Sequence, residues 1–576
     1  MKLRTSFFDP TVLKKDIARF APVWVVYTIM GLLIQSTMMG DLPYRISSAL
    51  ADTIGTLMPV LNCGYGILVA LLLFGDLFNS RLCNALHAMP LRREAWFVTH
   101  FTAGILFALV PNLVLTLIFM LMMESLWYTA LIWLLGAMLS FLFFFGLAVF
   151  SVMITGSRFG ALTMYGFFNF ASMEIWWVVY ELVLPFLYGV RLQDAAFATF
   201  SPVVYLLSYG EPGFELEHAC DTACQFYEWW GISRDCSYAF TGFTGSWGYL
   251  AGTALAGIAL TAAALLLYRR RQLEVAGDFA AIGLTRYLVE TFGTLGCGMV
   301  VRMFGFGDEG MEYVFLFVGL VVGFFLLQMV LQRRTKVFDR KNWIKLGAVV
   351  LAVILLLVIS VTDLFGIERR VPKPASVEKV LVADGDLSEY QLRRIEQGYT
   401  YHDSYVFLSD PADINNVRSA HREMLKSSAS SNYYHHITLC YYLKNGTKVV
   451  RSYRVGKDAE AFLGLADYFR AESLFGVSNK EEVRKYLSKI EWKSTLVQSA
   501  DMEKLVDLLW QDGENGLLRQ EWSYHEGLKS TVLYLHWNEG KNDVVKEIEV
   551  WEDAQATWPY LEGLAKANNF QNDWAW

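Results

Sequence analysis

Charged residues are scarce in this chain. Only 18% of its 576 residues carry a charge, whereas soluble domains carry about a quarter. The scarcity is uneven, because residues 366–576 contain 58 charged residues and the first 365 residues contain only 47. This distribution excludes a wholly soluble protein and predicts a membrane-embedded first part followed by a water-soluble domain. The net charge of −7 argues against a nucleic-acid partner.

The sequence also lacks the common signatures of catalysis. It has no phosphate-binding loop of the form GxxxxGKS or GxxxxGKT, and no HExxH, GxSxG or Ser/His/Asp pattern. We therefore expect no enzymatic activity, no cofactor and no metal in this chain. If it works in active transport, the energy must come from another polypeptide. The six histidines of the last 211 residues are interpreted as surface residues of a binding or scaffolding domain: His402, His421, His435, His436, His525 and His536.

Nine apolar stretches approach the length of about 20 residues that a membrane span needs. They cover roughly 21–38, 55–78, 96–121, 127–155, 159–189, 247–268, 287–306, 311–331 and 344–364. Basic clusters follow the second, sixth and eighth stretches, and the alternate connectors are acidic or neutral. The positive-inside rule then predicts a multi-pass protein of the bacterial plasma membrane, with a cytoplasmic N terminus and residues 366–576 outside the cell. The alternation requires the seventh stretch, which contains Glu290 and Arg302, to cross.

Residues 1–20 predict an amphipathic helix that lies on the inner leaflet. Lys14, Lys15 and Arg19 alternate with apolar residues after an Asp-Pro start. The alternative is a plain cytoplasmic extension of the first span.

The long connector 190–246 is expected on the outer side, where disulfides persist. It contains Cys220, Cys224 and Cys236. A disulfide between 220 and 236 or between 224 and 236 is plausible, with the third cysteine free or paired with Cys440. A metal site that includes His218 is a weaker interpretation of the same cysteines.

Residues 366–576 contain an internal repeat, with copies at about 375–485 and 486–576. "VVRSYRVGKDAEAFLGL" (449–465) aligns with "VVKEIEVWEDAQATWPY" (544–560). Each copy predicts a strand, a helix, a hairpin and a helix, which makes an α+β domain. "LKNGTK" predicts a tight Asn-Gly hairpin turn in the first copy, and "WNEGKND" predicts a looser turn in the second.

The stretch "LCNALHAMPLRREAW" (82–96) joins the second and third predicted spans on the cytoplasmic side. Its apolar residues recur at helical spacing, and Pro90 is expected to end the helix. These apolar residues are Phe78, Leu82, Leu86 and Met89. A short cytoplasmic helix with apolar residues and flanking arginines suits docking into a partner's groove. The alternative is a connector whose arginines only anchor the topology.

This stretch resembles the segment that ABC-2 type transporter permeases have between their second and third spans. The resemblance covers His87, Ala88, Met89, Pro90, Leu91, Arg92, Arg93 and Glu94. Ala88 stands where serine is usual, and Met89 stands where leucine is usual. "LYRRRQLEVAGDFAA" (267–281), directly after the sixth span, also resembles the family. The two motifs bracket a six-span unit at 21–283.

Residues 284–365, with three further spans, and the outer domain resemble the larger permeases of Gram-positive bacteria encoded in Ytr-like operons. The resemblance implies the permease subunit of a bacterial ABC transporter, an exporter or an antimicrobial-peptide resistance system. A separate cytoplasmic ATPase subunit, which carries ATP and Mg²⁺, would then engage the helix at 79–94. The residues expected to contact it are Leu86, His87, Met89, Pro90, Leu91, Arg92 and Arg93. A second permease and membrane lipid are further expected partners.

Three polar residues in the predicted spans are candidates for a transport path. Glu174 and Glu181 are seven residues apart on one face of the fifth span, and Asn62 interrupts the second. Acids at membrane depth are costly and often functional. The resemblance also implies that the fifth-span region is a helical hairpin dipping in from outside, where both acids would simply be solvated. Asn62 has the alternative role of a hydrogen bond between helices. A rival function is a membrane-anchored envelope sensor that transports nothing.

Overall fold

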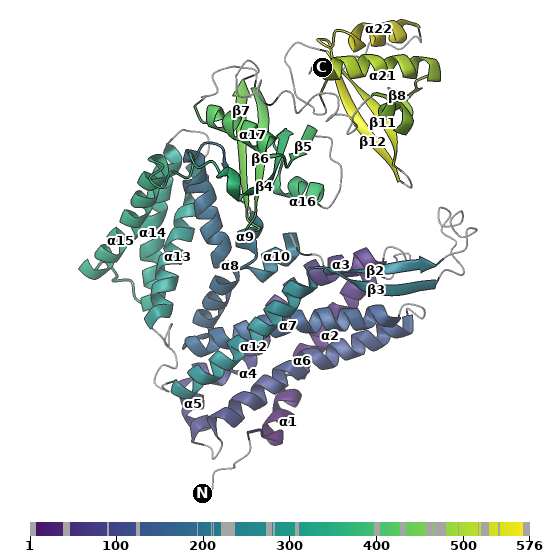
Figure 1. Cartoon of the computed structure of the whole chain (residues 1–576). Helices are drawn as coiled ribbons and strands as arrows, with labels where there is room; N and C mark the ends of the chain where they lie inside the picture. Colours follow the sequence, from purple (N-terminus) through teal and green to yellow (C-terminus); the bar gives the residue numbers. More distant parts are fainter. Residues whose placement is uncertain are drawn as a thin grey trace. The chain divides into compact units, whose positions relative to one another are not determined.

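The chain forms two compact units in a computed structural model (Figure 1). The first unit comprises Met1–Val179 and Asp194–Ile354, and the second comprises Tyr180–Gln193 and Leu355–Trp576. The structure describes residues 7–38, 46–88, 92–122, 127–192, 194–208, 210, 212–219, 237–271, 279, 283–305, 310–396, 404–426, 434–456, 465, 480–492, 495–515, 518–519, 529–539 and 542–567.

The described part of the first unit is mainly helical. Its helices are α1 (Pro10–Arg19), α2 (Ala21–Met38), α3 (Ile46–Asp52), α4 (Met58–Leu73), α5 (Ser80–His87), α6 (Arg93–Met122), α7 (Trp127–Ile154), α8 (Arg158–Leu182), α9 (Asp194–Ala198), α10 (Pro202–Ser208), α12 (Trp247–Arg270), α13 (Gly283–Arg302), α14 (Met311–Gln332) and α15 (Arg340–Val361). A two-stranded hairpin of β2 (Pro212–Ala219) and β3 (Ser237–Gly245) precedes α12.

Seven helical segments in the described residues are long and apolar enough to cross a membrane. They are Ala49–Leu73, Arg93–Leu121, Trp127–Ile154, Arg158–Phe186, Trp247–Arg270, Met311–Gln332 and Arg340–Val361. An eighth arises if α1 and α2, which meet at a 60° bend, count as one broken span. The seventh expected span forms α13, but α13 is not among the seven. Of the nine expected spans, seven are therefore confirmed as helices long and apolar enough to cross, or eight with the bent pair, and the crossing at 287–306 stays a prediction.

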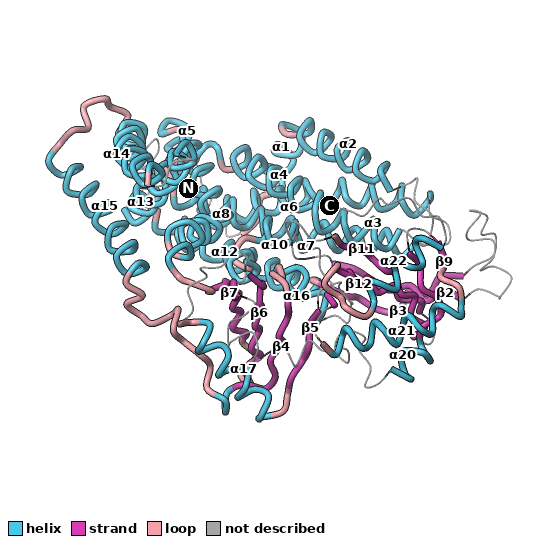
Figure 2. The backbone as a smooth tube through the Cα atoms, turned by 90° about the horizontal axis from the view of Figure 1, so that it is seen from above, coloured by secondary structure: helices cyan, strands magenta, loops and turns pink. Residues whose placement is uncertain are grey.

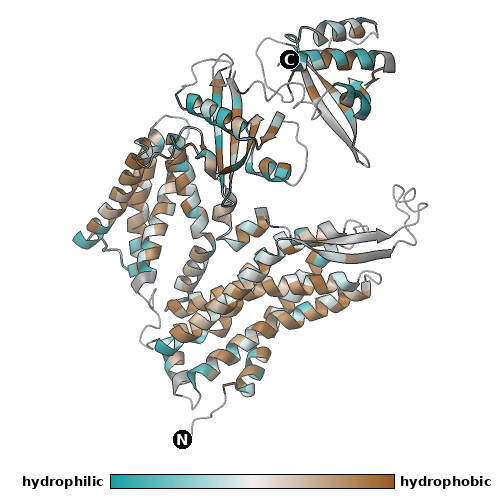
Figure 3. Ribbon diagram, viewed as in Figure 1, coloured by the Kyte–Doolittle hydropathy of each residue, from teal (hydrophilic) through white to brown (hydrophobic). Residues whose placement is uncertain are grey.

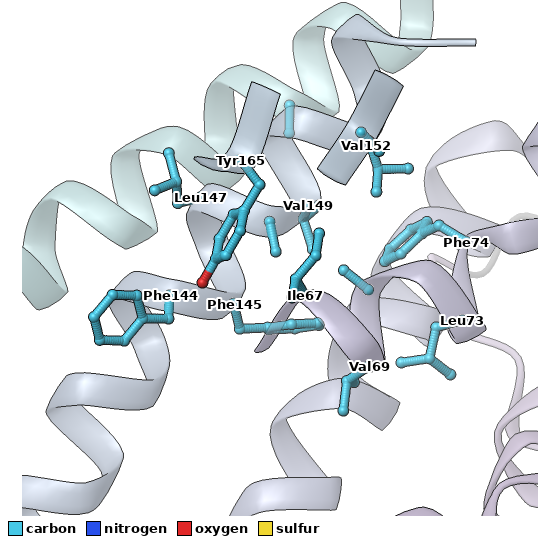
Figure 4. Packing of buried hydrophobic residues seen from close by; sticks show 14 of the residues in the cluster. Ile67, Val69, Leu73, Phe74, Phe144, Phe145, Leu147, Val149, Val152 and Tyr165 are labelled. Carbon is cyan, nitrogen blue, oxygen red and sulfur yellow. The ribbon is translucent and has the colours of Figure 1, made fainter. Parts of the chain in front are cut away.

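The helix α7 is the centre of the first unit. It is apolar on every side, and a helix of that kind is stable only when it is surrounded. It packs against α4, α6 and α12. Figure 4 shows part of the resulting cluster, to which Ile67 and Leu73 of α4 and Phe145 and Val149 of α7 belong. The ring of Phe145 fits against α6 because residue 104 is glycine, where a Cβ would stand 2.1 Å from the ring.

The backbones of α7 and α12 come into direct contact at two glycines, Gly146 and Gly257. A Cβ on Gly146 would lie 2.3 Å from the carbonyl oxygen of Gly257. A Cβ on Gly257 would lie 2.4 Å from the carbonyl oxygen of Leu142 and 2.6 Å from the Cα of Phe143. Small residues let membrane helices approach backbone to backbone in this way. Neither position can accept a side chain without separation of the two helices.

The N-terminal helix α1 forms where the sequence predicts it, but it does not rest on lipid alone. Asp9 caps it by accepting a hydrogen bond from the Thr11 amide at 2.8 Å. Its buried Asp16 lies 2.7 Å from Nδ1 of His100 in α6. Because Leu13 also packs on the main cluster, the apolar face of α1 contacts protein. The expected position of α1 on the inner leaflet stays a prediction.

Large apolar side chains remain exposed along the span helices. Leu121 is 72% exposed, and Leu255, Leu326 and Leu351 are also more than half exposed. Figure 3 shows apolar residues along most of the first unit, whereas the second unit mixes polar and apolar residues. A soluble protein rarely exposes so many large apolar side chains. Together with the candidate spans, this surface indicates a membrane protein.

The second unit contains two β-sheets with their helices. The elements around the first sheet are β1 (Val190–Arg191), β4 (Val377–Asp384), α16 (Glu389–Glu396), β5 (Ser404–Leu408), α17 (Pro411–Met424), β6 (Tyr434–Leu443) and β7 (Lys448–Gly456). Those around the second sheet are α20 (Lys480–Tyr486), β8 (Leu487–Trp492), β9 (Thr495–Leu496), α21 (Ser499–Glu514), β10 (Leu518–Arg519), β11 (Ser530–Glu539), β12 (Asn542–Trp551) and α22 (Thr557–Ala567).

The two sheets share the order of four of their five strands, β7-β6-β4-β5 in the first and β12-β11-β8-β9 in the second. The outer strand differs, because β1 comes from residues 190–191 and β10 lies between β9 and β11 in the chain. The first runs β1-β7-β6-β4-β5 and the second runs β10-β12-β11-β8-β9, with every pair antiparallel. Figure 2 shows β4, β5, β6 and β7 lying beside one another. The sequence missed β4 and α16, which precede the first strand it predicted.

The two hairpin turns differ from the prediction in their length. In the first sheet, Gly446 has a φ of +80° and its amide donates to the Leu443 carbonyl at 2.9 Å, so the Asn-Gly turn forms. In the second sheet, the pairing continues up to Glu539 with Asn542. Only two residues remain to join these strands. The second hairpin is therefore the tighter one, contrary to expectation.

The core of the first sheet contains an unexpected histidine. His421 of α17 is completely buried, and its ring nitrogens lie 3.0 Å from the Tyr441 hydroxyl and 2.8 Å from the Tyr453 hydroxyl. Burial, followed by the charges of nearby arginines, lowers the pKa of His421 to about 3. A neutral imidazole satisfies both contacts, since one hydroxyl donates to it and the other accepts from it. The interpretation of His421 as a surface residue was wrong.

Candidate functional site

The predicted docking stretch contains the short helix α5. Asn79 caps it, because its side-chain oxygen accepts a hydrogen bond from the Arg81 amide at 3.0 Å. Cys83 is buried on one side, and burial raises the pKa of its thiol. Leu82, the next residue before it, is 48% exposed. The helix thus presents an apolar side chain outward at one end of the first unit.

The residues expected to contact a partner are only partly described. Leu86 and His87 lie in the last turn of α5, and their side-chain positions are outside the described residues, as are Met89, Pro90 and Leu91. Whether Pro90 ends the helix therefore stays a prediction. Arg92 and Arg93 are described, and both are partly buried.

The two stretches that resemble the permease family meet in space. Nη1 of Arg93 lies 3.2 Å from the carbonyl oxygen of Arg271 and 3.5 Å from that of Arg269. The Glu94 carboxylate lies 3.2 Å from Nε of Arg269. Arg93 thereby satisfies carbonyl groups that the end of α12 leaves unpaired, and Glu94 carries negative charge in the first turn of α6. The two hydrogen bonds of Arg93 join residues 176 and 178 positions apart.

The end of α12 is also fastened to α7. Nη1 of Arg271 donates to the carbonyl groups of Val152 at 2.9 Å and Met153 at 3.3 Å. Beneath these arginines, the ring of Tyr268 packs 5.5 Å from that of Trp96. The side chains at the ends of α6, α7 and α12 thus form one connected group beside α5. We call Arg92, Arg93, Glu94, Arg269 and Arg271 the arginine cluster.

The arginine cluster borders an open cavity. The cavity has a volume of about 340 Å³ and is lined by Arg92, Arg93, Glu94 and Arg269. Arg92 also lies over the ring of Phe7, with its guanidinium carbon 5.6 Å from the ring centre. No motif in the sequence predicts this cavity, because its walls come from the start of α6 and the end of α12.

The two acidic candidates for a transport path lie on one continuous helix. α8 runs unbroken from Arg158 to Leu182, so Glu174 and Glu181 do not lie in a hairpin that dips back into the membrane. The Glu174 carboxylate lies against α13 at Gly296, which has no side chain. A Cβ added at Gly296 would lie 3.3 Å from Oε1 of Glu174. That oxygen is buried. Glu181 follows two turns later and belongs to the second unit.

Asn62 is part of a buried hydrogen-bond network between helices. Its amide donates to the carbonyl of Ala137 at 3.0 Å and its oxygen accepts from the Tyr27 hydroxyl at 2.9 Å. Asn112 of α6 in turn donates to the same hydroxyl at 3.1 Å. The network connects α2, α4, α6 and α7. These contacts favour the interhelical role of Asn62, while a role in transport stays a prediction.

The charges of α13 are paired. Glu290 is buried and lies 2.8 Å from Arg286 and 2.7 Å from Lys345 of α15. Arg302, at the other end of the helix, lies 2.5 Å from Glu312 of α14. The ion pairs therefore occupy the two end regions of α13, and residues 291–301 between them are uncharged. Paired charges near helix ends lower the cost of inserting such a helix into a bilayer.

A connection missed by the sequence joins α8 to the first sheet. After α8, the strand β1 pairs with β7, with Val190 opposite Arg451. Arg451 is buried, and its guanidinium donates to the carbonyl of Ile367, in the segment that follows α15. Gly189 has a φ of +70°, and a Cβ there would stand 2.0 Å from the ring of Tyr453. The ends of α8 and α15 thus both attach to strand β7.

In the part of the chain that the structure describes, the cysteines form no disulfide and no metal site. Cys220, Cys224 and Cys236 lie outside the described residues, so their pairing stays a prediction. Cys440 is a free thiol, fully buried in the first sheet, and burial raises its pKa to about 11. Within the described residues, no group of three histidine, cysteine or acidic side chains is arranged to bind a metal.

Comparison with known proteins does not assign the chain. No protein-family model, no curated protein and no solved structure matches it.

Proposed function

We propose that the chain is the membrane-spanning permease subunit of a bacterial ABC transporter. The transporter is an exporter or an antimicrobial-peptide resistance system, and a separate ATPase subunit supplies its energy. One observation carries the proposal: stretches 82–96 and 267–281, each of which resembles the permease family, are joined through Arg93, Glu94 and Arg269 beside α5. A motif needed only to anchor topology would not require that contact. The comparisons support no family, so the proposal rests on this geometry and on the sequence motifs.

The strand pairing of β1 supports the topology that this function needs. β1 follows α8 and pairs with β7, which follows α15. A β-sheet lies on one side of a membrane, so α8 and α15 must end on the same side. If α12, α14 and α15 each cross once, a fourth crossing is required between these ends. α13 has 20 residues, enough for about 30 Å of helix, and supplies that crossing.

The resulting orientation agrees with the distribution of charge. The basic groups Arg269–Arg271 and 333–341 fall on one side of the membrane, together with α5 and the arginine cluster. The positive-inside rule makes this side cytoplasmic. The two sheets then lie outside the cell. The shared order of β7-β6-β4-β5 and β12-β11-β8-β9 supports the interpretation of residues 366–576 as two copies of one module.

In the proposed mechanism, the ATPase acts on the helices through α5. A movement of α5 is passed by the arginine cluster to the ends of α6 and α12. α7 and α12 are in backbone contact at Gly146 and Gly257, so α7 follows α12. The helices α6, α7 and α12 therefore move as one body. This movement alternates the exposure of a path lined by the first, second and fifth expected spans. Glu174, against Gly296, is our candidate for a residue of that path. A second permease subunit completes the assembly.

The docking step is tested by co-purification of the chain with an ABC ATPase subunit of the same organism. Leu82→Asp adds a charge to the exposed side of α5 without changing its buried side. We expect this variant to lose the ATPase while the permease itself is produced and purified as before. Leu496→Asp is the matched control, since Leu496 is 58% exposed on β9 in the second unit. If Leu82→Asp and the control retain the ATPase equally, α5 is not the docking helix.

A membrane-anchored sensor is the second candidate function. It is favoured by the attachment of both α8 and α15 to strand β7, which offers a direct route from a ligand on the first sheet to two membrane helices. A sensor would not need the ATPase. Co-purification of a histidine kinase in place of an ATPase would favour it.

A further inference from the structure

The cavity beside the arginine cluster has the composition of an anion site. Among the described residues, three guanidinium groups and one carboxylate line it, with a net charge of +2. The carboxylate of Glu94 lies 3.2 Å from Nε of Arg269, so the lining acid is already paired. The remaining groups, chiefly Arg92, have no described acidic partner. Uncompensated guanidinium groups around a cavity attract phosphate groups, which they bind through paired hydrogen bonds.

The backbone adds to the attraction. The cavity lies at the start of α6, a helix of 30 residues, whose first amide groups have no partner within the helix. The carbonyl of Arg92 accepts the first intrahelical hydrogen bond, from Trp96 at 3.2 Å. The amides of Arg93, Glu94 and Ala95 therefore precede the regular ladder. The positive end of the helix dipole and the arginines act on the same space.

The position of the cavity indicates which kind of molecule would bring a phosphate group to it. It lies where two candidate spans, Arg93–Leu121 and Trp247–Arg270, reach their polar ends. At that depth a bilayer presents lipid headgroups, and basic pockets between membrane helices are suited to acidic ones. A volume of about 340 Å³ is within the range of small-ligand sites.

We propose that this cavity binds the phosphate-bearing headgroup of an anionic phospholipid. The lipid phosphate lies between Arg92 and Arg269, and its acyl chains extend along α6 and α12. Arg93 acts as a positioning residue, because its guanidinium already holds the end of α12. The inference rests on the proposed membrane topology and not on the ATPase. A bound lipid would link the arginine cluster, through which α5 acts, to the composition of the membrane.

The proposal is tested with the purified full-length chain in detergent. Phosphatidylglycerol, phosphatidylcholine or inorganic phosphate is added, and the melting temperature and the number of retained lipids in native mass spectrometry are measured. The variants are Arg92→Gln, Arg269→Gln and Arg269→Lys. Arg270→Gln is the matched control, because Arg270 is exposed on the same turn of α12 but does not line the cavity. The melting temperature without lipid shows whether each variant folds.

Phosphatidylglycerol should stabilise the wild type and Arg270→Gln, whereas phosphatidylcholine should not. Loss of one guanidinium contact should weaken phosphatidylglycerol binding by about tenfold in Arg92→Gln and Arg269→Gln. Arg269→Lys, which keeps the charge, should retain part of it. An equal effect of inorganic phosphate would support the site but assign it to a phosphate from solution. If phosphatidylglycerol acts equally on all variants, or if Arg270→Gln loses as much as Arg269→Gln, the cavity is not the site.

Discussion

The backbone contact between α7 and α12 predicts that a side chain at residue 257 destabilises the protein. Gly257→Ala adds a methyl group 2.4 Å from the Leu142 carbonyl oxygen and 2.6 Å from the Phe143 Cα. Both atoms belong to the backbone, so the helices must separate by about 1 Å to restore ordinary contact. Overpacking of this kind costs about 1–3 kcal/mol. The gain in helix propensity from glycine to alanine, about 1 kcal/mol, offsets only part of it.

The matched control is on the same helix. Gly252→Ala adds an identical methyl group, but no atom lies within 4 Å of it. We expect Gly252→Ala to be neutral or slightly stabilising and Gly257→Ala to be destabilising. The measurement is thermal unfolding of the purified protein in one detergent, followed by intrinsic fluorescence. Equal melting temperatures for the two variants would refute the close contact between α7 and α12, and with it the proposal that these helices move together.

Further predictions concern α13 and the first sheet. If α13 crosses the membrane, Met311 lies outside the cell and Phe338 lies inside. In a chain with its seven cysteines replaced by alanine, Met311→Cys should then react with a membrane-impermeant maleimide in intact cells, and Phe338→Cys should react only after permeabilisation. The reverse result would show that α13 does not cross. His421 binds a proton more weakly in the folded state, so acidification from pH 7 to pH 5 should lower the free energy of unfolding of the second unit by about 2 kcal/mol. In thermal melts, the stability of His421→Gln should depend less on pH than that of the wild type. Arg451→Gln should release the segment after α15 and increase its cleavage in limited proteolysis; unchanged cleavage would contradict the tether.

The sign of the pH effect follows from linkage. Burial holds the folded-state pKa of His421 near 3, below the value of about 6.5 in an unfolded chain. Between these values the unfolded state binds more protons, so stability falls as the pH is lowered through 6.5. Above pH 7 the residue is neutral in both states and contributes no pH dependence.

Much of the candidate site could be predicted from local sequence. A helix within 79–94 was expected because apolar residues recur at helical spacing, and α5 occupies Ser80–His87 of that stretch. Phe78 lies outside α5, because Asn79 caps the helix. The sequence could not tell which side of α5 is buried, because that depends on helices from other parts of the chain. Leu82 and Cys83 are neighbours and both apolar, yet Cys83 is buried and Leu82 is exposed.

The sequence by itself determined where the long apolar helices lie, where the charge-rich residues 366–576 begin and which two stretches resemble the permease family. Apolar runs, caps and charge distribution are local properties, and a chain in a bilayer has few other ways to satisfy its backbone. Only the tertiary structure decided that Arg93 meets Arg269, that β1 joins the sheet of residues 377–456, and that His421 is buried. Each of these contacts joins elements distant in the chain or depends on packing between them, and no local pattern specifies which distant element will be the neighbour.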